Sequence, residues 1–441
     1  MPPVPPSATL TSLFLYDAFP RGYHPMTKKT SARAASLPFE IEATHAHPLG
    51  MPVERFLRDY WHKRPLLIRN AFPDFETPVQ PEDLAGLACE EGVLARLISL
   101  DRATGTWDVR TGPFQEEDFP SLPHHDWTLL VQDVDKWDAD VRQLLEQFRF
   151  LPRWRVDDIM ISFAATGGSV GAHVDHYDVF LLQAQGDRRW MIDASVAMGK
   201  PAPDLGFQDD VAIKLLRQFD PTHEWVLAPG DMLYLPPLVP HHGVAENACL
   251  TFSVGMRAPS SAELIGDYLD TLIADADDAV RYHDEDLTAP HDPNEIDARA
   301  MERVVEALNA LRMNDPDLVG DWFGRFITTY RASGDVMPAP ETPSRIEMEW
   351  DLQQGARLLR HPFSRFAWRR RRQGASLFCN GLDYALPVKD AQLLAALEGL
   401  DGTTYGALSD AGRDAVIALA AQGHYQLAFD DDGLDPQDED A

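Results

Sequence analysis

Five short runs of β-type sequence between residues 151 and 258 constrain the fold of this chain more than any other feature. They are DIMISFAAT, DVFLLQAQG, RRWMID, EWVLAPGDMLYLP and ACLTFSVGMRAP, and turns separate them. Short strands at this spacing are typical of antiparallel sandwiches and barrels. We therefore expect a sandwich or barrel in this part of the chain.

The flanking segments read as a mixture of helices and strands. PVERFLRDYWHKRPLLIRNAF predicts a short amphipathic helix followed by a strand at Leu66–Ile68. PEDLAGLACEEGVLARLI (81–98) reads as one helix with a proline in its first turn. WDVRTGPF and WTLLVQDV are strand-like, and DADVRQLLEQFRF is helical. Ahead of them, residues 1–45 are rich in Pro, Ser, Thr and Ala, and we expect a disordered extension.

The C-terminal part is predicted to contain two further blocks. Residues 259–336 are mostly helical, and their apolar faces exceed what short helices need within one domain, which indicates a shared interface and a homodimer. After a linker (337–345), residues 337–429 have the proportions of a winged-helix module. The last twelve residues, 430–441, carry seven acids, and we expect a mobile tail.

Charge and cysteine content restrict the partners and the compartment. The chain has 441 residues with 39 Lys+Arg and 70 Asp+Glu, a net charge of −31. Such a chain repels phosphate backbones and anionic lipids and attracts basic proteins, although acidity for solubility explains the charge equally well. Three separated cysteines without a CxxC motif exclude a disulfide scaffold or thiolate zinc site and fit a reducing compartment, the cytoplasm. The sequence contains no run of about 18 apolar residues, the length that would predict a membrane-spanning helix.

One stretch, GGSVGAHVDHYDVFLLQAQGDRRWMI, carries the chemistry. If His173-Val174-Asp175 lies on a strand, the histidine and the carboxylate point to the same side. The later stretch PPLVPHHGV supplies a second histidine, at His241 or His242. Two histidines and one carboxylate on one face of a metal leave open positions, as in the facial triad of non-haem Fe(II) oxygenases. The spacing therefore predicts a metal site.

With these motifs the sequence resembles the JmjC-type, 2-oxoglutarate-dependent ribosomal oxygenases. The resemblance covers roughly 48–441 and rests on YWHKRPLLI, DDIMISF, GGSVGAHVDHYDVFLLQ, DRRWMI, LAPGDMLYLPPLVPHHG and FSVGMRAPS. It implies an α+β chain: a double-stranded β-helix (cupin barrel) with N-terminal helices in residues 46–258, a helical dimerisation region and a C-terminal winged-helix domain.

The resemblance also implies roles for particular residues. The metal ligands fall on His173, Asp175 and His241, because the family pattern Pro-His-x-Gly selects the first of the two adjacent histidines. The metal is Fe(II), with 2-oxoglutarate and O2 as cosubstrates. The basic residue that binds the far carboxylate of 2-oxoglutarate falls on Arg188, since a guanidinium can bind a carboxylate bidentately.

Other residues are expected to line the same cavity. Met160 and Ser162 share one strand face, and Ser162 can donate a hydrogen bond to the cosubstrate or be a satisfied core serine. Asp158 and, less clearly, Ser253 are candidate contacts for a protein substrate, because a carboxylate suits a guanidinium. His176, which follows the H-x-D pair, is expected to lie outside the metal site.

The implied reaction is hydroxylation of a protein side chain, with an arginine of large-subunit ribosomal protein L-sixteen as the expected target. Alternatives are a histidyl hydroxylase or demethylase of the same class, a metal-binding cupin without redox chemistry, and a scaffold that binds ribosomal proteins. Direct nucleic-acid binding is not expected, because residues 343–441 hold ten basic and 16 acidic residues. The run Arg369 to Arg372 is either a solvated strand face or a site for an acidic neighbour.

Overall fold

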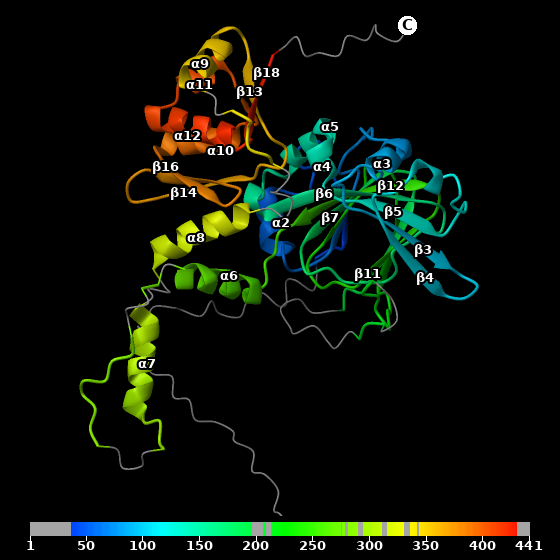
Figure 1. Cartoon of the computed structure of the whole chain (residues 1–441). Coiled ribbons are helices and arrows are strands. Elements are labelled where there is room, and N and C mark those ends of the chain that lie inside the picture. The colour runs from blue at the N-terminus through cyan, green and yellow to red at the C-terminus, as the bar shows by residue number, and fades with distance from the viewer. Residues whose placement is uncertain are drawn as a thin grey trace, which may run out of the picture. The chain divides into compact units, whose positions relative to one another are not determined.

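A computed structural model describes residues 37–195, 206–208, 213–274, 276–277, 281–289, 294–310, 315–329, 336–341 and 344–429 (Figure 1). Most of the predicted extension, residues 1–36, and the acidic tail lie outside these residues. The predicted boundary at residue 45 is wrong, because strand β1 (Glu40–Glu42) pairs in parallel with β2 (Leu66–Arg69). The alternation Glu40-Ile41-Glu42 in this edge strand is only three residues long.

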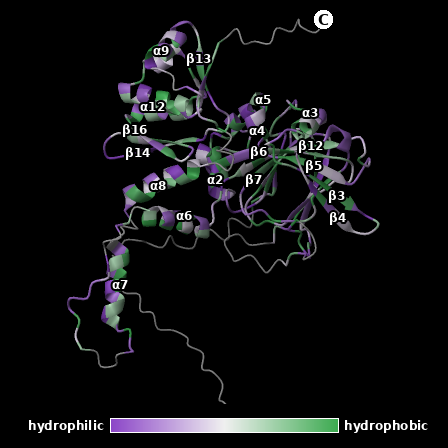
Figure 2. Ribbon diagram, viewed as in Figure 1, coloured by the Kyte–Doolittle hydropathy of each residue, from purple (hydrophilic) through white to green (hydrophobic). Residues whose placement is uncertain are grey.

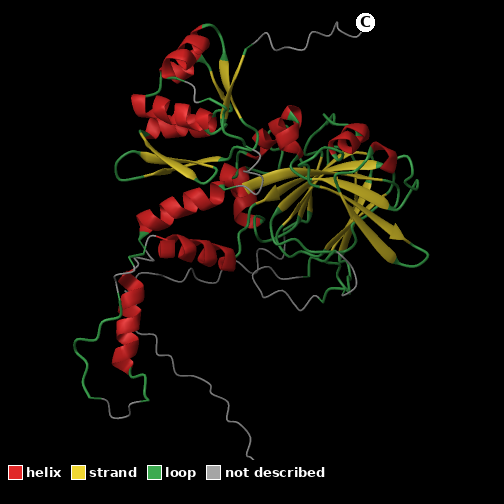
Figure 3. Ribbon diagram, in the orientation of Figure 1, coloured by secondary structure: helices red, strands yellow, loops and turns green. Residues whose placement is uncertain are grey.

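Two sheets form the barrel that the five β runs predicted (Figures 1 and 3). The larger sheet has nine strands among the described residues, in the order β1, β2, β10 (Met232–Leu235), β7 (Val179–Gln185), β12 (Cys249–Met256), β6 (Val156–Ala164), β5 (Trp127–Val131), β3 (Ala95–Asp101) and β4 (Thr106–Thr111). The smaller sheet has the order β11 (His241–Ala245), β8 (Arg188–Ile192) and β9 (His223–Leu227).

The two sheets pack against each other through alternate residues of their strands. Leu181 on β7 and Leu233 on β10 belong to one buried cluster with Trp190 and Ile192 on β8. The residues between them face the other way, where Phe180 and Tyr234 pack around the buried Phe56 of helix α2 (Val53–Asp59). Both faces of these central strands are therefore covered, which explains their nearly continuous apolar sequence.

The segment before the barrel contains the clearest error of the sequence-based prediction. Residues 81–98 do not form one helix: α3 (Pro81–Leu87) ends before the turn at Gly92, whose φ is 85°, and β3 follows. Antiparallel pairing of β3 with both β4 and β5 decides the conformation there.

The segment 139–148 is helical as predicted. The short helices that precede β6 are α4 (Val134–Trp137), α5 (Ala139–Gln143), and the single 3-10 turns η2 (Leu144–Phe148) and η3 (Arg153–Arg155), while η1 (Glu116–Asp118) lies earlier.

The helical region contains α6 (Ser261–Ala274), α7 (Ala298–Ala310) and α8 (Pro316–Thr328), as predicted. Along α8, apolar and polar residues alternate (Figure 2). Its Trp322 contacts Tyr268 of α6 with ring centroids 4.7 Å apart and donates a 2.6 Å hydrogen bond to Asp267. Part of the apolar face of α6 is therefore covered within the chain. No described helix has the length and apolar character needed to cross a bilayer.

The C-terminal module has its own buried core and combines helices with two three-stranded sheets. One sheet has the order β17 (Gly399–Leu400), β13 (Arg357–Arg360), β18 (Tyr425–Ala428), and the other β14 (Phe366–Arg370), β15 (Ala375–Cys379), β16 (Leu382–Leu386). The helices are α9 (Arg345–Gln353), α10 (Val388–Ala396), α11 (Gly402–Gly406) and α12 (Asp410–Ala421).

The arginine run is explained by helix α8. Arg369 and Arg371 both bind Asp321, at 3.2 Å and 2.7 Å, and Arg369 also binds Asp317 at 2.8 Å. Arg370 and Arg372, on the alternate positions, are exposed. Of the two interpretations of the arginine run, a site for an acidic neighbour therefore holds for Arg369 and Arg371. A solvated strand face holds for Arg370 and Arg372.

Candidate functional site

Three polar side chains from two chain segments meet at one end of the smaller sheet. Asp175 Oδ2 lies 4.0 Å from His173 Nε2 and 3.6 Å from His241 Nε2. Reciprocal backbone hydrogen bonds of 3.0 Å between His173 and His241 fix the two chain segments side by side. A ligand atom from each of the three residues lies within 4.8 Å of the others, close enough to share one metal ion. The structure therefore brings the predicted ligand set together.

The backbone also sets the tautomers of both histidines. His173 Nδ1 lies 3.0 Å from the carbonyl oxygen of Gly171, and His241 Nδ1 lies 2.9 Å from that of Val239. A carbonyl only accepts, so each Nδ1 carries the proton and each Nε2 keeps a lone pair directed toward Asp175. Burial, and secondarily the neighbouring His173, lower the pKa of His241 to about 4, so its imidazole is neutral near pH 7. Neutral imidazoles are the form that binds a metal.

The adjacent histidine has a different environment. His242 Nε2 lies 2.9 Å from Ser169 Oγ, and burial lowers the pKa of His242 to about 4. Because strand residues alternate in direction, His242 points away from the carboxylate that His241 approaches. The start of β11 thus places His241 beside Asp175 and His242 beside Ser169.

One detail of the prediction is wrong: His173-Val174-Asp175 is not a strand. These residues form a loop in which His173 makes only an isolated bridge to His241. The loop still directs both side chains to one point, because the bridge holds its first residue against β11. His176 is exposed, as expected for a residue outside the metal site.

A cavity of about 520 Å³ contains the three residues and every other candidate from the sequence. The candidates along its wall are Asp158, Met160, Ser162, Arg188 and Ser253. Met160 and Ser162 lie on β6 beside β12, and the register pairs Met160 with Ser253. A cavity of this size suits a small-molecule cosubstrate together with an inserted side chain.

Arg188 is a buried cation within this cavity. Its Nη1 donates to Ser162 Oγ at 3.3 Å and to Thr251 Oγ1 at 3.4 Å, while its Nε has no hydrogen-bond partner among the described residues. Burial lowers the pKa of Arg188. The next residue, Arg189, faces outward and pairs with Glu224 and Glu246. A buried guanidinium with an unused donor is suited to binding a carboxylate. The two hydroxyl groups that it contacts are neutral and do not balance its charge.

Sequence reasoning missed Thr251, which contacts this guanidinium, and Gln183, which binds Thr251. Thr251 donates a 3.0 Å hydrogen bond to Gln183 Oε1. The side-chain nitrogen of Gln183 in turn donates to two backbone carbonyls. Both residues are buried polar side chains in apolar strands, and Thr251 shares a strand face with Ser253 by period two. This period-two spacing from Ser253 was the signal by which the sequence could have indicated Thr251.

Asp158, the candidate substrate contact, is buried at the cavity wall and accepts a 3.2 Å hydrogen bond from the backbone of Asp133. Burial, together with the nearby Asp133, Asp157 and Asp135, raises the pKa of Asp158 to about 7. The carboxyl therefore changes charge near neutral pH. A cation placed against it would favour the ionised form.

The fold and site together define a class: JmjC-type barrels of the cupin fold joined to a winged-helix domain. Residues 143–264 match the model of the JmjC domain, and residues 310–426 match the ROXA-like winged helix. Both blocks were predicted from the sequence in this order.

Curated relatives identify the family. The chain is 36% identical to the ribosomal protein uL16 3-hydroxylase of Escherichia coli over 84% of its own length and 96% of that protein. It is 44% identical to a probable ribosomal oxygenase of Haemophilus influenzae over 49% of its length and 52% of that protein. The chain belongs to the JmjC ribosomal oxygenases, which are 2-oxoglutarate-dependent enzymes, and the predicted family is confirmed.

Solved structures support the same conclusion. The X-ray structure of E. coli YcfD has a TM-score of 0.77 at 32% identity and covers 86% of this chain and 98% of its own. A structure of YcfD in complex with cobalt and 2-oxoglutarate has a TM-score of 0.74 at 32% identity, over 86% of this chain and 99% of its own.

Proposed function

We propose that the protein is an Fe(II)- and 2-oxoglutarate-dependent hydroxylase of an arginine side chain in large-subunit ribosomal protein L-sixteen. The observation that supports the proposal most strongly is the pairing, in one cavity, of the His173, Asp175 and His241 group with the buried cation of Arg188. One part suits a divalent metal with open positions, and the other suits a dicarboxylate.

The residues have separate roles in this proposal. His173, Asp175 and His241 would hold Fe(II), which supplies the redox chemistry when bound with 2-oxoglutarate and O2. Arg188 would bind the far carboxylate of 2-oxoglutarate, with Ser162 beside it and Met160 against its apolar chain. Thr251 would keep the guanidinium in place.

Asp158 and Ser253 would contact the substrate. The Asp158 carboxylate would bind the arginine guanidinium, and Ser253, whose register neighbour is Met160, would line the path to the metal. The net charge of −31 supports a basic partner of this kind. A ribosomal-protein substrate also supports a cytoplasmic location, and the exposed apolar residues of α7 support a homodimer.

The test is incubation of the purified protein with Fe(II), 2-oxoglutarate and the ribosomal proteins of one large subunit, followed by intact-mass analysis. The expected result is gain of one oxygen atom by L-sixteen, which fragmentation places on an arginine. The matched control is the His241→Ala variant, which should leave the mass unchanged.

Other outcomes identify the alternatives. Oxygen on a histidine indicates a histidyl hydroxylase, and loss of a methyl group indicates a demethylase. A protein that retains metal but does not turn over 2-oxoglutarate would be a cupin without redox chemistry, or a scaffold for ribosomal proteins.

A further inference from the structure

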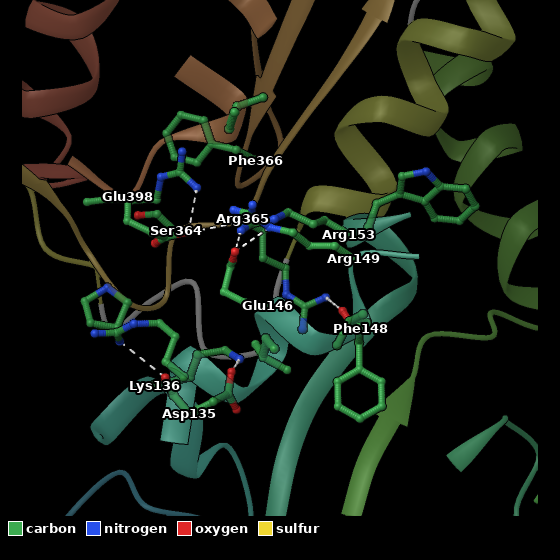
Figure 4. Close-up of a pocket in the computed structure, with 18 of the residues that line it drawn as sticks. Asp135, Lys136, Glu146, Phe148, Arg149, Arg153, Ser364, Arg365, Phe366 and Glu398 are labelled. Atoms are coloured by element: carbon green, nitrogen blue, oxygen red, sulfur yellow. Dashed lines mark hydrogen bonds and ion pairs between the residues drawn. The ribbon is translucent and has the colours of Figure 1, made fainter. Parts of the chain in front are cut away.

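A second cavity, of about 410 Å³, lies between the helices that precede β6 and the winged-helix module (Figure 4). Its walls come from α4, α5, η2 and η3 on one side and from β13, the start of β14 and the end of α10 on the other. It is distinct from the metal-site cavity. Ligand sites are common at such domain boundaries, and the volume suits a small organic molecule.

The charge around this cavity is opposite to that of the whole chain. Four acids contribute to the wall, whereas the cations number six: Lys136, Arg142, Arg149, Arg153, Arg360 and Arg365. The wall thus has a local excess of two positive charges within a chain of net charge −31. Five of the six cations are arginines, whose planar fork matches carboxylate and phosphate oxygens.

Some of these cations have structural partners within the protein. Lys136 pairs with the buried Asp135, Arg365 binds Asp157 at 2.6 Å, and Arg360 donates to backbone carbonyls at the end of α10. Of these three, only Arg365 connects the two walls, since Lys136 and Arg360 bind partners on their own side of the cavity.

The other three lie together on the side of α5, η2 and η3. Arg149 and Arg153 share the carboxylate of Glu146, and Figure 4 shows them gathered around it with Arg365. Arg153 also binds Glu398, on the opposite wall, at 2.9 Å. Arg142 donates a 3.2 Å hydrogen bond to the backbone carbonyl of Asp135, and no carboxylate of a described residue lies within ion-pair distance of it. The three arginines therefore face two carboxylates, those of Glu146 and Glu398, and Arg142 is bound by neither of them.

Part of the remaining wall is apolar and aromatic. Phe148, Trp154 and Phe366 all line the cavity. Flat apolar surfaces beside guanidinium groups suit a planar body that carries an oxyanion. We propose that this interdomain cavity is a second ligand site, which binds an organic anion with a carboxylate or phosphate group on a planar body.

The site is connected to the metal-site cavity through one residue. Asp157 lines both cavities, and it precedes Asp158 at the start of β6. On the side of the second cavity its carboxylate is bound by Arg365. A ligand that contacts this wall therefore touches the segment that positions the substrate contact.

The test is a fluorescence titration with anilinonaphthalene sulfonate, a planar aromatic probe with one oxyanion group. The full chain is loaded with Co(II) and saturating 2-oxoglutarate, so that the metal-site cavity is filled. The expected result is saturable binding that weakens at least about tenfold in the Arg142→Gln, Arg149→Gln double variant. Ala396→Glu, which adds a negative charge at the exposed end of α10, should weaken probe binding by a similar factor. This variant replaces the double variant in the test if the double variant is unstable.

The matched control is Arg58→Gln, which removes one exposed, acid-paired arginine elsewhere on the molecule and should leave affinity unchanged. The uncharged analogue N-phenyl-naphthylamine should show no dependence on the arginines. Displacement of the probe by indole acetate identifies a carboxylate ligand, and displacement by adenosine monophosphate a phosphate ligand. Displacement by neither, or equal probe affinity in wild type and both cavity variants, would overturn the proposal.

Discussion

Two adjacent histidines at the start of β11 differ in what they can do, because successive strand residues point in opposite directions. His241 lies beside Asp175, whereas His242 lies beside Ser169. We expect His241→Ala to abolish metal retention and 2-oxoglutarate turnover, since it removes one of three ligands. His242→Ala should retain both at near wild-type level. Metal content by mass spectrometry and succinate formation measure the difference, and a reversed result would exchange the two roles.

The carboxyl of Asp158 gives the reaction a pH dependence. Its pKa is raised to about 7, mainly by burial, so it is largely neutral below that pH and ionised above it. Only the ionised form attracts a substrate guanidinium. We therefore expect kcat/KM for the protein substrate to rise as the pH rises through about 7. Succinate formation without protein substrate is the reference reaction and should lack this step.

Asp158→Asn is the matched variant for that prediction. It keeps the size of the side chain and removes its charge, so the pH step should disappear. At high pH the loss of a charge-assisted hydrogen bond of roughly 1.5–3 kcal/mol corresponds to at least about a tenfold fall in kcat/KM. A step that persists in the variant would assign the titration to another group.

At this scale the sequence placed eight candidate side chains in one cavity, because H-x-D spacing and period two are local patterns. It missed Thr251, although the period-two spacing from Ser253 indicated it, and it could not find Gln183, whose contact with Thr251 joins β12 to β7 across 68 positions of the chain. It also could not show that residues 173–175 form a loop, since the bridge to His241 depends on a distant strand.

At the scale of elements, prediction succeeded where burial imposes an apolar pattern on the sequence, as on the buried strand β7 and on the helices of the winged-helix module. It failed on residues 95–98, whose apolar spacing suits a helix but whose backbone pairs with β4 and β5. Pairing between strands is a long-range property, and it overrides local propensity there.

The contact between α8 and β14 provides a test of the arginine run. Arg369 binds Asp317 and Asp321, and its guanidinium lies so close to Gly320 that a Cβ there would approach it to 2.4 Å. We expect Arg369→Ala to lower the free energy of unfolding by about 1 kcal/mol, because the pairs form a partly buried network. Arg370→Ala, its exposed neighbour, should have no measurable effect in urea denaturation. Equal effects would show that the run contributes only general charge.

At the scale of the whole molecule, α7 supports a dimer better than α6 does. The apolar face of α6 is partly covered by α8, but Met301, Val304, Val305 and Leu308 on α7 are exposed. An exposed apolar face of this kind indicates an interaction surface. Light scattering should give about twice the chain mass of 49.3 kDa. Val305→Asp with Leu308→Asp should give a monomer, whereas Ile346→Asp, on the exposed face of α9, should not. A wild-type monomer at micromolar concentration would contradict the dimer.

The acidity of the whole chain predicts how substrate capture depends on salt. A net charge of −31 attracts a basic ribosomal protein at long range and speeds encounter. Screening shortens that range, because the Debye length falls from about 10 Å at 0.1 M salt to about 3 Å at 1 M. Buried contacts such as that of Asp158 are screened much less. We expect kcat/KM for the protein substrate to fall steeply between about 50 mM and 500 mM salt. Over the same range kcat, and 2-oxoglutarate turnover without protein substrate, should change little, because neither depends on encounter with the protein substrate. If kcat/KM is flat, the acidity serves solubility, and substrate choice resides in the cavity around Asp158.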